Sequence, residues 1–530
     1  MRNLELPGRS PTRALTGMAA TSQAQASVTA IDILKAGGNA IDAAIAACAV
    51  QCVVEPGSTG IGGDCFALIS KGGSDEIIAY NGSGRAPMSA TTDWYVNQGI
   101  KKIERQTPHA VTVPGAVDAW TRLLADHGTM SLGTVLAPAI AYARDGYAIS
   151  SRVSVDFDMA TGILYADPTA RRIMLPGGKA PMEGDVHHQT ELAKTLQHIA
   201  ENGRDAFYSG WVAEDIVSHL NSIGGLHTLE DFATAQGEYV TPISGEYLGH
   251  RIIECPPNGQ GIIALELMNI LSALDMADHG PLSVERLHRF LEATRIAYRD
   301  RDRHVADPSQ AEIPFDLILS KERAMRLAAG IDTSHRQNNL PEADMPEHAD
   351  TVYLCVVDKD RNAVSFINSL FSSFGSGLCG PKSGVMLHNR GMGFNIDANH
   401  PNTIAPGKRP MHTIIPAMAV EGERTVMPFG VMGGAYQAAG HAWFLSNMLE
   451  HGMDIQEAID LPRVFATLED TVEIESGVPE DVVQRLVAMG HKRVVPDKPI
   501  GGGQAIHINW KTGVLTGGSD PRKDGFAIGY

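Results

Sequence analysis

The feature that most constrains the fold is an abrupt change of character at residue 350. Residues 332–350 are polar, include two prolines and contain almost no apolar anchors, which is typical of a solvated linker. Residues 351–357 follow without a break and are rich in β-forming side chains, and residues 363–368 repeat that pattern after a charged turn. We therefore expect a β-hairpin that begins at Thr351, directly after a linker.

Strands accompanied by helices are predicted on both sides of this boundary. An apolar helical pattern over residues 27–54 is interrupted at Gly37-Gly38-Asn39, and a hairpin of residues 65–69 and 76–80 follows it. Further expected elements are strands at 111–115, 414–420, 425–428 and 505–509, helices at 132–146, 283–302, 438–450 and 479–489, and a mostly helical stretch over 183–327. This order predicts an α+β fold in which stacked sheets are covered by helices.

Charge and hydropathy disfavour several classes of partner. The chain of 530 residues has a formal net charge of −18, which argues against nucleic acid and anionic membranes as partners. There is no run of about 20 apolar residues and no secretory signal pattern at the start, so we expect a cytoplasmic protein without a membrane span. The six cysteines lie mostly in apolar runs without zinc-site spacing, and they are expected to be buried free thiols.

Thr351 is a candidate nucleophile on one condition. A threonine hydroxyl is a poor nucleophile and needs an adjacent base. Cleavage of the Asp350–Thr351 peptide bond would give Thr351 a free α-amine with a pKa of about 8, which can take the proton from its own Oγ. On local features alone, an ordinary β-branched strand residue after a loop is the commoner explanation.

Gly433 and Gly434 are candidate oxyanion-hole residues, because they follow an apolar strand and precede a helix. A tight strand-to-helix turn would need the same residues. The run Gly60-Ile61-Gly62-Gly63-Asp64 lacks the Lys and Ser/Thr of a phosphate loop, and we interpret it as a structural turn. Neither a G-x-S-x-G elbow nor an H-E-x-x-H motif is present.

Motifs along the whole chain resemble the γ-glutamyltransferase family. They are Gly37-Gly38-Asn39-Ala40-Ile41-Asp42-Ala43-Ala44, Gly60-Ile61-Gly62-Gly63-Asp64, Val113-Pro114-Gly115, Pro256-Pro257-Asn258-Gly259-Gln260-Gly261, Asp350-Thr351, Phe374-Gly375-Ser376-Gly377, Gly433-Gly434 and Ser519-Asp520-Pro521-Arg522. The resemblance implies an αββα four-layer N-terminal-nucleophile fold, made as a precursor that cuts itself. The implied subunits are residues 1–350, the large one, and 351–530, the small one. No metal or organic cofactor is implied.

The resemblance also implies roles for individual residues. Thr351 matches the family nucleophile, and Ser369 stands where family members carry a second hydroxyl that hydrogen-bonds it. Gly433 and Gly434 match the oxyanion-hole pair.

The substrate pocket departs from the family pattern. Classical members hold a zwitterionic γ-glutamyl group with an Arg, a Ser pair, an Asn, a Gln and an Asp. The corresponding residues in this chain are Ser83, with Arg85 two residues on, His412-Thr413, Phe371, Arg390 and Gly393. Because the acid that would face an ammonium is missing, we expect Arg390, His412, Thr413 and Arg85 to bind an acidic substrate group.

The resemblance is to a divergent branch that includes γ-glutamyltransferase-like proteins, cephalosporin side-chain acylases and the oxamate amidohydrolase of purine breakdown. The expected function is a self-processing threonine amidohydrolase that acts on a small carboxylate-bearing amide such as oxamate. The alternatives are a γ-glutamyltransferase or glutathione hydrolase, and an inactive binding protein on the same fold. The expected partners are the small-molecule amide and the two subunits of one precursor, and a dimer of these heterodimers is one assembly that the resemblance allows.

Overall fold

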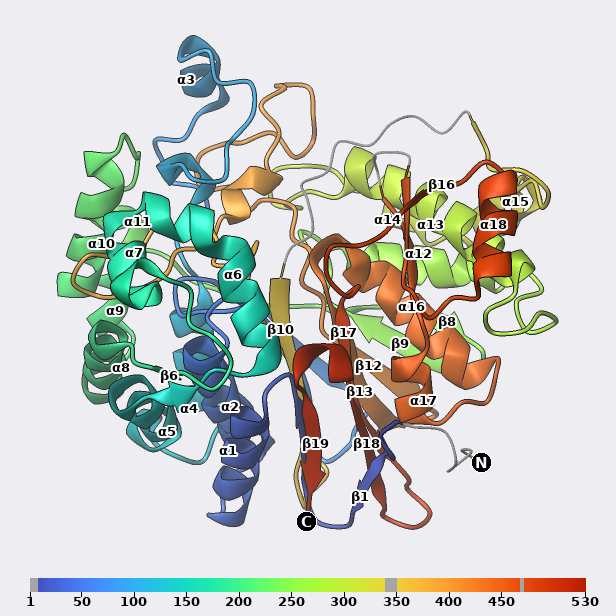
Figure 1. Cartoon of the computed structure of the whole chain (residues 1–530), viewed down its shortest axis with the longest axis horizontal. Helices are drawn as coiled ribbons and strands as arrows, with labels where there is room; N and C mark the ends of the chain where they lie inside the picture. Colours follow the sequence, from blue (N-terminus) through green and yellow to red (C-terminus); the bar gives the residue numbers. More distant parts are fainter. Residues whose placement is uncertain (1–7, 339–349, 468–470) are drawn as a thin grey trace.

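The computed structural model describes residues 8–338, 350–467 and 471–530, and its centre consists of two seven-stranded antiparallel sheets (Figure 1). The first, called the β10 sheet, has the order β19 (Phe526–Gly529), β2 (Met18–Thr21), β10 (Asp350–Val357), β11 (Ala363–Phe371), β3 (Asp64–Ser70), β4 (Ile77–Gly82) and β7 (Glu238–Val240). The second, called the β13 sheet, has the order β1 (Thr12–Ala14), β18 (Leu515–Ser519), β17 (Gly502–Ile508), β13 (Arg424–Met432), β12 (Ala417–Glu421), β9 (His250–Glu254) and β8 (Ile243–Tyr247).

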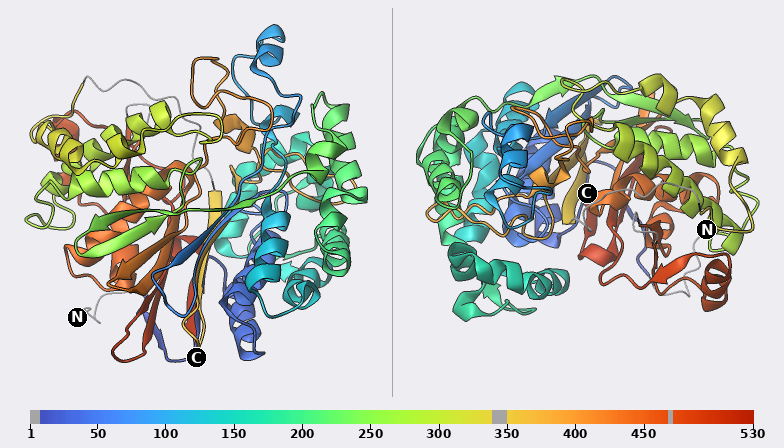
Figure 2. Two further views of the ribbon diagram at one scale, coloured as in Figure 1. Left: turned by 180° about the vertical axis from the view of Figure 1, so that it is seen from behind. Right: turned by 90° about the horizontal axis from the view of Figure 1, so that it is seen from above.

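Helices cover the outer face of each sheet, so the fold has four layers, αββα (Figures 1 and 2). The β10 sheet is covered by α1 (Ala24–Lys35), α2 (Ala40–Val54), α4 (Ala116–His127), α5 (Leu132–Asp145) and α8 (Thr190–Asn202). The β13 sheet is covered by α12 (Gly261–Leu271), α13 (Val284–His304), α16 (Gln437–Leu449) and α17 (Ile455–Asp460). This is the fold that the sequence predicts.

The remaining elements surround these layers. The helices are α3 (Thr92–Asn97), α6 (Ser151–Ala166), α7 (Pro168–Met174), α9 (Asp205–Tyr208), α10 (Trp211–Ser222), α11 (Leu229–Ala233), α14 (Phe315–Ile318), α15 (Lys321–Ala329) and α18 (Glu480–Ala488). The strands are β5 (Tyr147–Ala148), β6 (Val186–His187), β14 (Val464–Ala466), β15 (Thr471–Ile474) and β16 (Lys492–Val494).

The central strands are buried on both faces. In β10, Tyr353 packs between the two sheets, whereas the next residue, Leu354, packs against the helical layer. In β3, Phe66 likewise packs between the two sheets and Ala67 packs against the helical layer. Such strands are apolar at successive positions, because each face meets a packed layer. This is why residues 351–357 form a continuous apolar run instead of an alternating one.

Helix α2 is buried along its entire length against the β10 sheet. Its many small residues allow the helix to lie close to its neighbours, and its apolar character extends around the whole circumference, as expected of an internal helix. Asn39 caps its N-terminus by accepting hydrogen bonds from the N–H groups of Ile41 and Asp42, and the Asp42 carboxylate accepts one from the Asn39 N–H. The expected break between two helices at residues 37–39 is confirmed.

Several predicted elements are confirmed, and one is wrong. The hairpins β3–β4 and β10–β11 form, and the six cysteines are buried and free. Residues 111–115 are extended but form no strand. Val113 donates its N–H to Arg85 O (3.0 Å) and Gly115 donates to Gly63 O (3.0 Å), so the segment bonds to loops. Pro114 has no N–H to donate to a ladder.

The mostly helical prediction for residues 183–327 misses strands β6, β7, β8 and β9. Strands β7 and β8 form the edges of their sheets and are short and half-exposed. Polar side chains on edge strands protect against unwanted pairing, and they also weaken the sequence signal.

Among the described residues, no helix is long and apolar enough to cross a membrane.

The predicted linker is described only in part. Residues 339–349 lie outside the described residues. Before them, the backbone of Asp332 accepts a hydrogen bond from His288 of α13 (2.7 Å), and Arg336 donates its N–H to Met489 O (2.8 Å). After them, Asp350 is the first residue of β10, so the strand starts one residue earlier than expected.

Candidate active site

Thr351 lies in an irregular pairing at the start of β10. Asp350 pairs with Phe371 and Val352 pairs with Asn368, so two residues of β11 stand opposite the single residue Thr351. Such a bulge bends the strand locally and re-aims a side chain. The Thr351 and Ser369 hydroxyls share a hydrogen bond of 3.0 Å, and both residues are fully buried. The structure therefore brings together the expected nucleophile and its expected hydroxyl partner.

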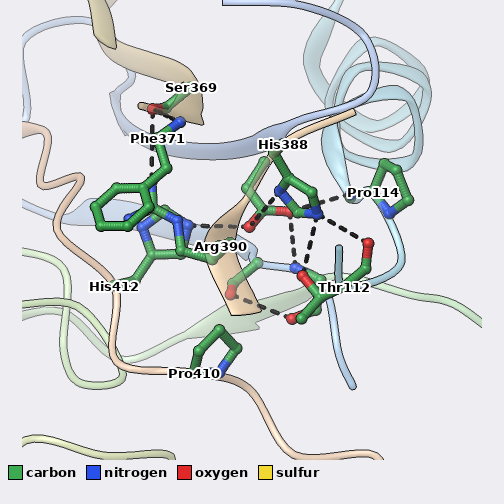
Figure 3. A network of polar contacts seen from close by, with 12 residues as sticks. Thr112, Pro114, Ser369, Phe371, His388, Arg390, Pro410 and His412 are labelled. Carbon is green, nitrogen blue, oxygen red and sulfur yellow. Dashed lines mark hydrogen bonds and ion pairs between the residues drawn. The ribbon is translucent and has the colours of Figure 1, made fainter. Parts of the chain in front are cut away.

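Ser369 connects this pair to the substrate-pocket residues. Its Oγ accepts hydrogen bonds from the N–H of Phe371 (2.9 Å) and, at 3.5 Å, from Nη2 of Arg390 (Figure 3). Phe371 has a φ of 79°, which is unusual for a bulky residue and typical of strained backbone near functional sites. Its ring lies 4.1 Å from the Arg390 guanidinium carbon.

Arg390 is the central cation of the site. It starts the short helical turn Arg390–Gly393, its side chain is fully buried, and Nη1 donates to Thr413 Oγ1 at 2.9 Å. No carboxylate of the described residues lies within ion-pair distance of the guanidinium, and its Nε has no hydrogen-bond partner there. Burial lowers the pKa of Arg390 to about 9, so the group is still a cation at neutral pH. The nearby Asp64 carboxylate opposes this effect of burial on the Arg390 pKa, but it acts through space and not through an ion-pair contact.

A buried carboxylate, Asp64, which follows the glycine-rich turn of residues 60–63, organises the histidines behind Arg390. Asp64 Oδ2 accepts a hydrogen bond from His412 Nε2 at 3.0 Å and lies 3.6 Å from His388 Nδ1. Its Oδ1 accepts from the N–H of Gly84 (2.9 Å). Burial alone would raise the pKa of Asp64, but the nearby His388, His412 and Arg390 outweigh burial and lower it to about 2. The carboxylate is therefore ionised and fully engaged.

His412 is neutral in this arrangement. Nε2 donates to Asp64, and Nδ1 accepts a hydrogen bond from the N–H of Ile414 at 3.2 Å, so both ring nitrogens are occupied. Burial, with Arg390 as the next cause, lowers the pKa of His412 to about 3. His412 therefore lies in the predicted site but supplies no positive charge. Thr413 holds Arg390 through its hydroxyl.

Arg85 is placed differently from the other predicted residues. Its guanidinium lies 3.6 Å from carboxylates of both Glu238 and Asp307, donates to Gly407 O (3.0 Å), and the side chain is about one-third exposed. Its charge is therefore already matched by acids outside the Arg390 cluster. Ser83, the residue at the family's arginine position, accepts a hydrogen bond from Asn258 Nδ2 at 3.1 Å.

Gly433 and Gly434 form the sharp turn between β13 and the helix that follows. Their φ values are 122° and 57°, which side-chain-bearing residues rarely adopt, and a Cβ on Gly433 would lie 2.8 Å from Gly501 Cα. Gly434 O accepts a hydrogen bond from Gln260 Nε2 (3.0 Å), which also donates to Thr413 O (2.8 Å). Gln260 thus connects the glycine turn to the pocket residues.

The glycine turn lies at the same end of the sheet interface as Thr351. Strands β10 and β13 pack against each other, and Tyr353 lies against Gly430. Thr351 precedes Tyr353 toward the start of β10, and the glycines follow Gly430 beyond the end of β13. The run 60–63 is a structural turn, as expected, because a Cβ on Gly63 would collide with Ser369 O.

Asp64 and His388 carry little signal in the sequence. Asp64 ends a glycine-rich turn and could have been singled out as an acid at the start of a buried strand. His388 was not distinguishable among 20 histidines. In the parts of the chain that the structure describes, no group of three or more His, Cys, Asp and Glu side chains is arranged to hold a metal ion.

Comparisons with known proteins agree with this geometry. The family model described as Gamma-glutamyltranspeptidase matches residues 26–530. The glutathione hydrolase-like YwrD proenzyme of Bacillus subtilis (strain 168) is 38% identical over 507 residues, which cover 94% of this chain and 95% of that protein. The oxamate amidohydrolase proenzyme of Klebsiella pneumoniae is 33% identical over 528 residues, with 97% and 98% coverage.

The solved structure of a cephalosporin acylase from Bacillus halodurans superimposes with a TM-score of 0.92 at 38% sequence identity, and covers 100% of this chain and 99% of its own. The two relatives are named as proenzymes, the precursors of processed enzymes. The chain therefore belongs to the gamma-glutamyltranspeptidase family of self-processing N-terminal-nucleophile hydrolases.

Proposed function

We propose that the protein hydrolyses the amide bond of a small substrate that carries a carboxylate and no ammonium next to it. The observation that carries this proposal is the fully buried guanidinium of Arg390, which contacts the partner of Thr351 and forms no ion pair or hydrogen bond with a carboxylate of the described residues. A substrate carboxylate would neutralise this charge and accept two parallel hydrogen bonds from the guanidinium. Oxamate is one such substrate.

The proposed chemistry begins with cleavage of the Asp350–Thr351 peptide bond. The freed α-amine of Thr351 takes the proton from its own Oγ, which attacks the amide carbonyl. The N–H groups of Gly433 and Gly434 stabilise the oxyanion. The carbon–nitrogen bond then breaks, and the leaving amine receives the proton from the α-ammonium. Water, deprotonated by the same amine, attacks the ester, releases the acid and returns the proton to Oγ. Ser369 orients the Thr351 hydroxyl throughout.

The substrate charge follows from the electrostatics of the pocket. An ammonium placed beside the buried Arg390 guanidinium is repelled, and it also loses its hydration. The buried acid near Arg390 is Asp64, and its two oxygens accept hydrogen bonds from His412 and from the Gly84 N–H. It is therefore poorly suited to receive a substrate amine. The name of the Klebsiella pneumoniae relative, an oxamate amidohydrolase, supports the same substrate class.

A glutathione hydrolase is the second candidate, because the Bacillus subtilis relative is named glutathione hydrolase-like. This activity needs a site for the γ-glutamyl ammonium. It would require Asp64 to exchange its hydrogen bond with His412 for one with the substrate.

A matched pair of primary amides separates the two candidates. Glutaramate and glutamine have the same carbon chain and carboxylate, and they differ only in the α-ammonium. We expect kcat/KM for ammonia release from glutaramate to exceed that from glutamine by at least about tenfold, equivalent to ~1.4 kcal/mol. Oxamate and glutathione complete the panel, with ammonia and cysteinylglycine as the measured products. A preference for glutamine or glutathione would overturn the proposal.

A further inference from the structure

A cleft of about 440 Å³ opens beside the proposed site. Its walls come from the C-terminal end of α13 (residues 299–303), from residues 392–402, and from Lys101, Lys102 and Met411. Gly393 and Met411 lie on this wall, and they are close in sequence to Arg390 and His412, respectively. Two residues of the cleft wall are therefore close sequence neighbours of two residues of the proposed pocket.

A hydrogen-bond path also joins the cleft to the reacting groups. Arg301, on the wall, donates from Nη1 to Gln260 Oε1 at 3.1 Å. Gln260 in turn donates to Thr413 O and to Gly434 O. Arg301 of the wall thus holds Gln260, which connects the glycine turn to Thr413, the hydrogen-bond partner of Arg390.

The cleft is positively charged on an otherwise acidic protein. Lys101, Lys102 and Arg303 are exposed, and none of them forms an ion pair within the described residues. Arg299 and Arg301 have acids beside them, Asp300 at 3.2 Å and Asp302 at 2.9 Å. The exposed acid of the wall, Asp397, accepts hydrogen bonds from Asn399. Three unmatched cations therefore gather around one cleft, although the chain carries a net charge of −18.

We propose that this cleft binds a second anionic group of the substrate, carried by the part that leaves as the amine. The proposal rests on the proposed function, in which Arg390 binds the carboxylate of the acyl part. It names the substrate class as an acylated acidic amino acid or acidic peptide. A compound of the size of oxamate would fill only the Arg390 pocket and leave the cleft empty.

The binding is expected to be electrostatic and salt-sensitive. An ion pair with an exposed lysine or arginine contributes modestly, about a factor of two each, so three of them together give roughly tenfold. Such interactions are screened when the Debye length falls from about 10 Å at 0.1 M salt to about 3 Å at 1 M. A buried charge such as Arg390 is screened much less.

Two matched substrates test the cleft. N-glutaryl-glutaminamide and N-glutaryl-glutamate have nearly the same shape, but the second adds two carboxylates to the leaving part. In the processed wild-type enzyme we expect kcat/KM for N-glutaryl-glutamate to be higher by roughly tenfold at low salt, through a lower KM, and the ratio to fall toward one at 1 M salt.

Variants then assign the effect to the cleft. The triple change Lys101→Gln, Lys102→Gln and Arg303→Gln should remove the preference and leave hydrolysis of glutaramate unchanged. Lys511→Gln, in the exposed turn between β17 and β18, is the matched control and should keep the preference.

The outcomes separate the two proposals. If glutaramate is hydrolysed but the two N-glutaryl substrates are equivalent, or the triple variant keeps the preference, the cleft proposal is overturned alone. If no carboxylate-bearing amide is hydrolysed, the proposed function fails, and the cleft proposal fails with it.

Discussion

Among single residues, Arg390 is notable because it is fully buried and hydrogen-bonded but makes no ion-pair contact with a carboxylate of the described residues. Phe371 stacks on the guanidinium and Thr413 holds one end of it, so its position is determined before any substrate arrives. A buried charge without a direct ion pair lowers the stability of a folded protein. Its presence beside Thr351 and Ser369 is explained if a substrate anion completes the pair.

The first prediction concerns Arg390→Gln, which restores the residue type of classical members. Removing a charged hydrogen-bond donor should lower kcat/KM for glutaramate by at least about tenfold, since such bonds contribute about 1.5–3 kcal/mol. The free energy of unfolding should change little, because the desolvation cost of the buried guanidinium disappears together with its through-space attraction to Asp64. Arg390→Lys is the control that keeps the charge but loses the two parallel donors of the guanidinium, and its kcat/KM for glutaramate should be intermediate. Unchanged activity in Arg390→Gln would refute the assigned role.

The second prediction concerns the pH dependence of stability through Asp64. Its pKa is lowered from 3.8 to about 2 in the folded state, so it stabilises the fold above pH 3.8, and this stabilisation is lost as the pH falls toward 2. The difference corresponds to about 2 kcal/mol. Asp64→Asn should therefore be less stable than wild type at pH 7, and the gap should narrow below about pH 4. Urea unfolding at several pH values measures this gap, and a gap independent of pH would contradict the assignment.

At the scale of elements, two irregularities place the proposed reacting groups. The bulge in the β10–β11 pair places the Thr351 hydroxyl beside that of Ser369. The turn after β13 has two successive positive φ values at Gly433 and Gly434. Regular continuation of either strand would change where its residues point, because side chains alternate along a strand.

The third prediction is that Gly434→Val lowers turnover. A β-branched residue does not adopt the positive φ of this position, so the turn must shift and its N–H donors with it. Loss of one oxyanion donor typically costs about 3 kcal/mol, roughly a hundredfold in kcat. Gly422→Val is the matched control, since Gly422 also has a positive φ, of 59°, but stands in open space in the hairpin between β12 and β13. A folded, processed Gly434→Val enzyme with normal kcat would show that the oxyanion hole lies elsewhere.

At the scale of the whole molecule, the two parts of the chain are interleaved. The β10 sheet takes β2, β3, β4 and β7 from before residue 350 and β10, β11 and β19 from after it. The β13 sheet likewise combines β1, β8 and β9 with β12, β13, β17 and β18. Cleavage before Thr351 would therefore cut one covalent bond without separating two bodies.

The fourth prediction follows from this interleaving. Purified wild-type protein should show two chains on a denaturing gel, the smaller starting Thr-Val-Tyr-Leu, but both should elute together from a sizing column without denaturant. Thr351→Ala should stay one chain, because the attacking hydroxyl is lost. Thr351→Ser keeps a hydroxyl and should still be processed. An uncut wild type with full activity, or a different new N-terminus, would exclude the proposed mechanism.

Features that depend on neighbours along the chain could be predicted from the amino-acid sequence. Local composition and spacing predict the hairpin that begins near Thr351 and the broken helix pair before residue 55. Backbone sterics explain the geometry that Gly433-Gly434 adopt. The family motifs added the pairing of Thr351 with Ser369, and the structure shows that hydrogen bond.

The electrostatics of the site, in contrast, depend on the packing of segments that are distant in the chain. Asp64 lies far along the chain from His388 and His412, and no local pattern links it to them, yet folding brings its carboxylate against both histidines behind Arg390. His412 is kept neutral there, while Arg85 is matched by acids elsewhere. A side chain's charge state depends on its burial and on which charges lie within a few ångströms. Those quantities exist only once distant segments have packed.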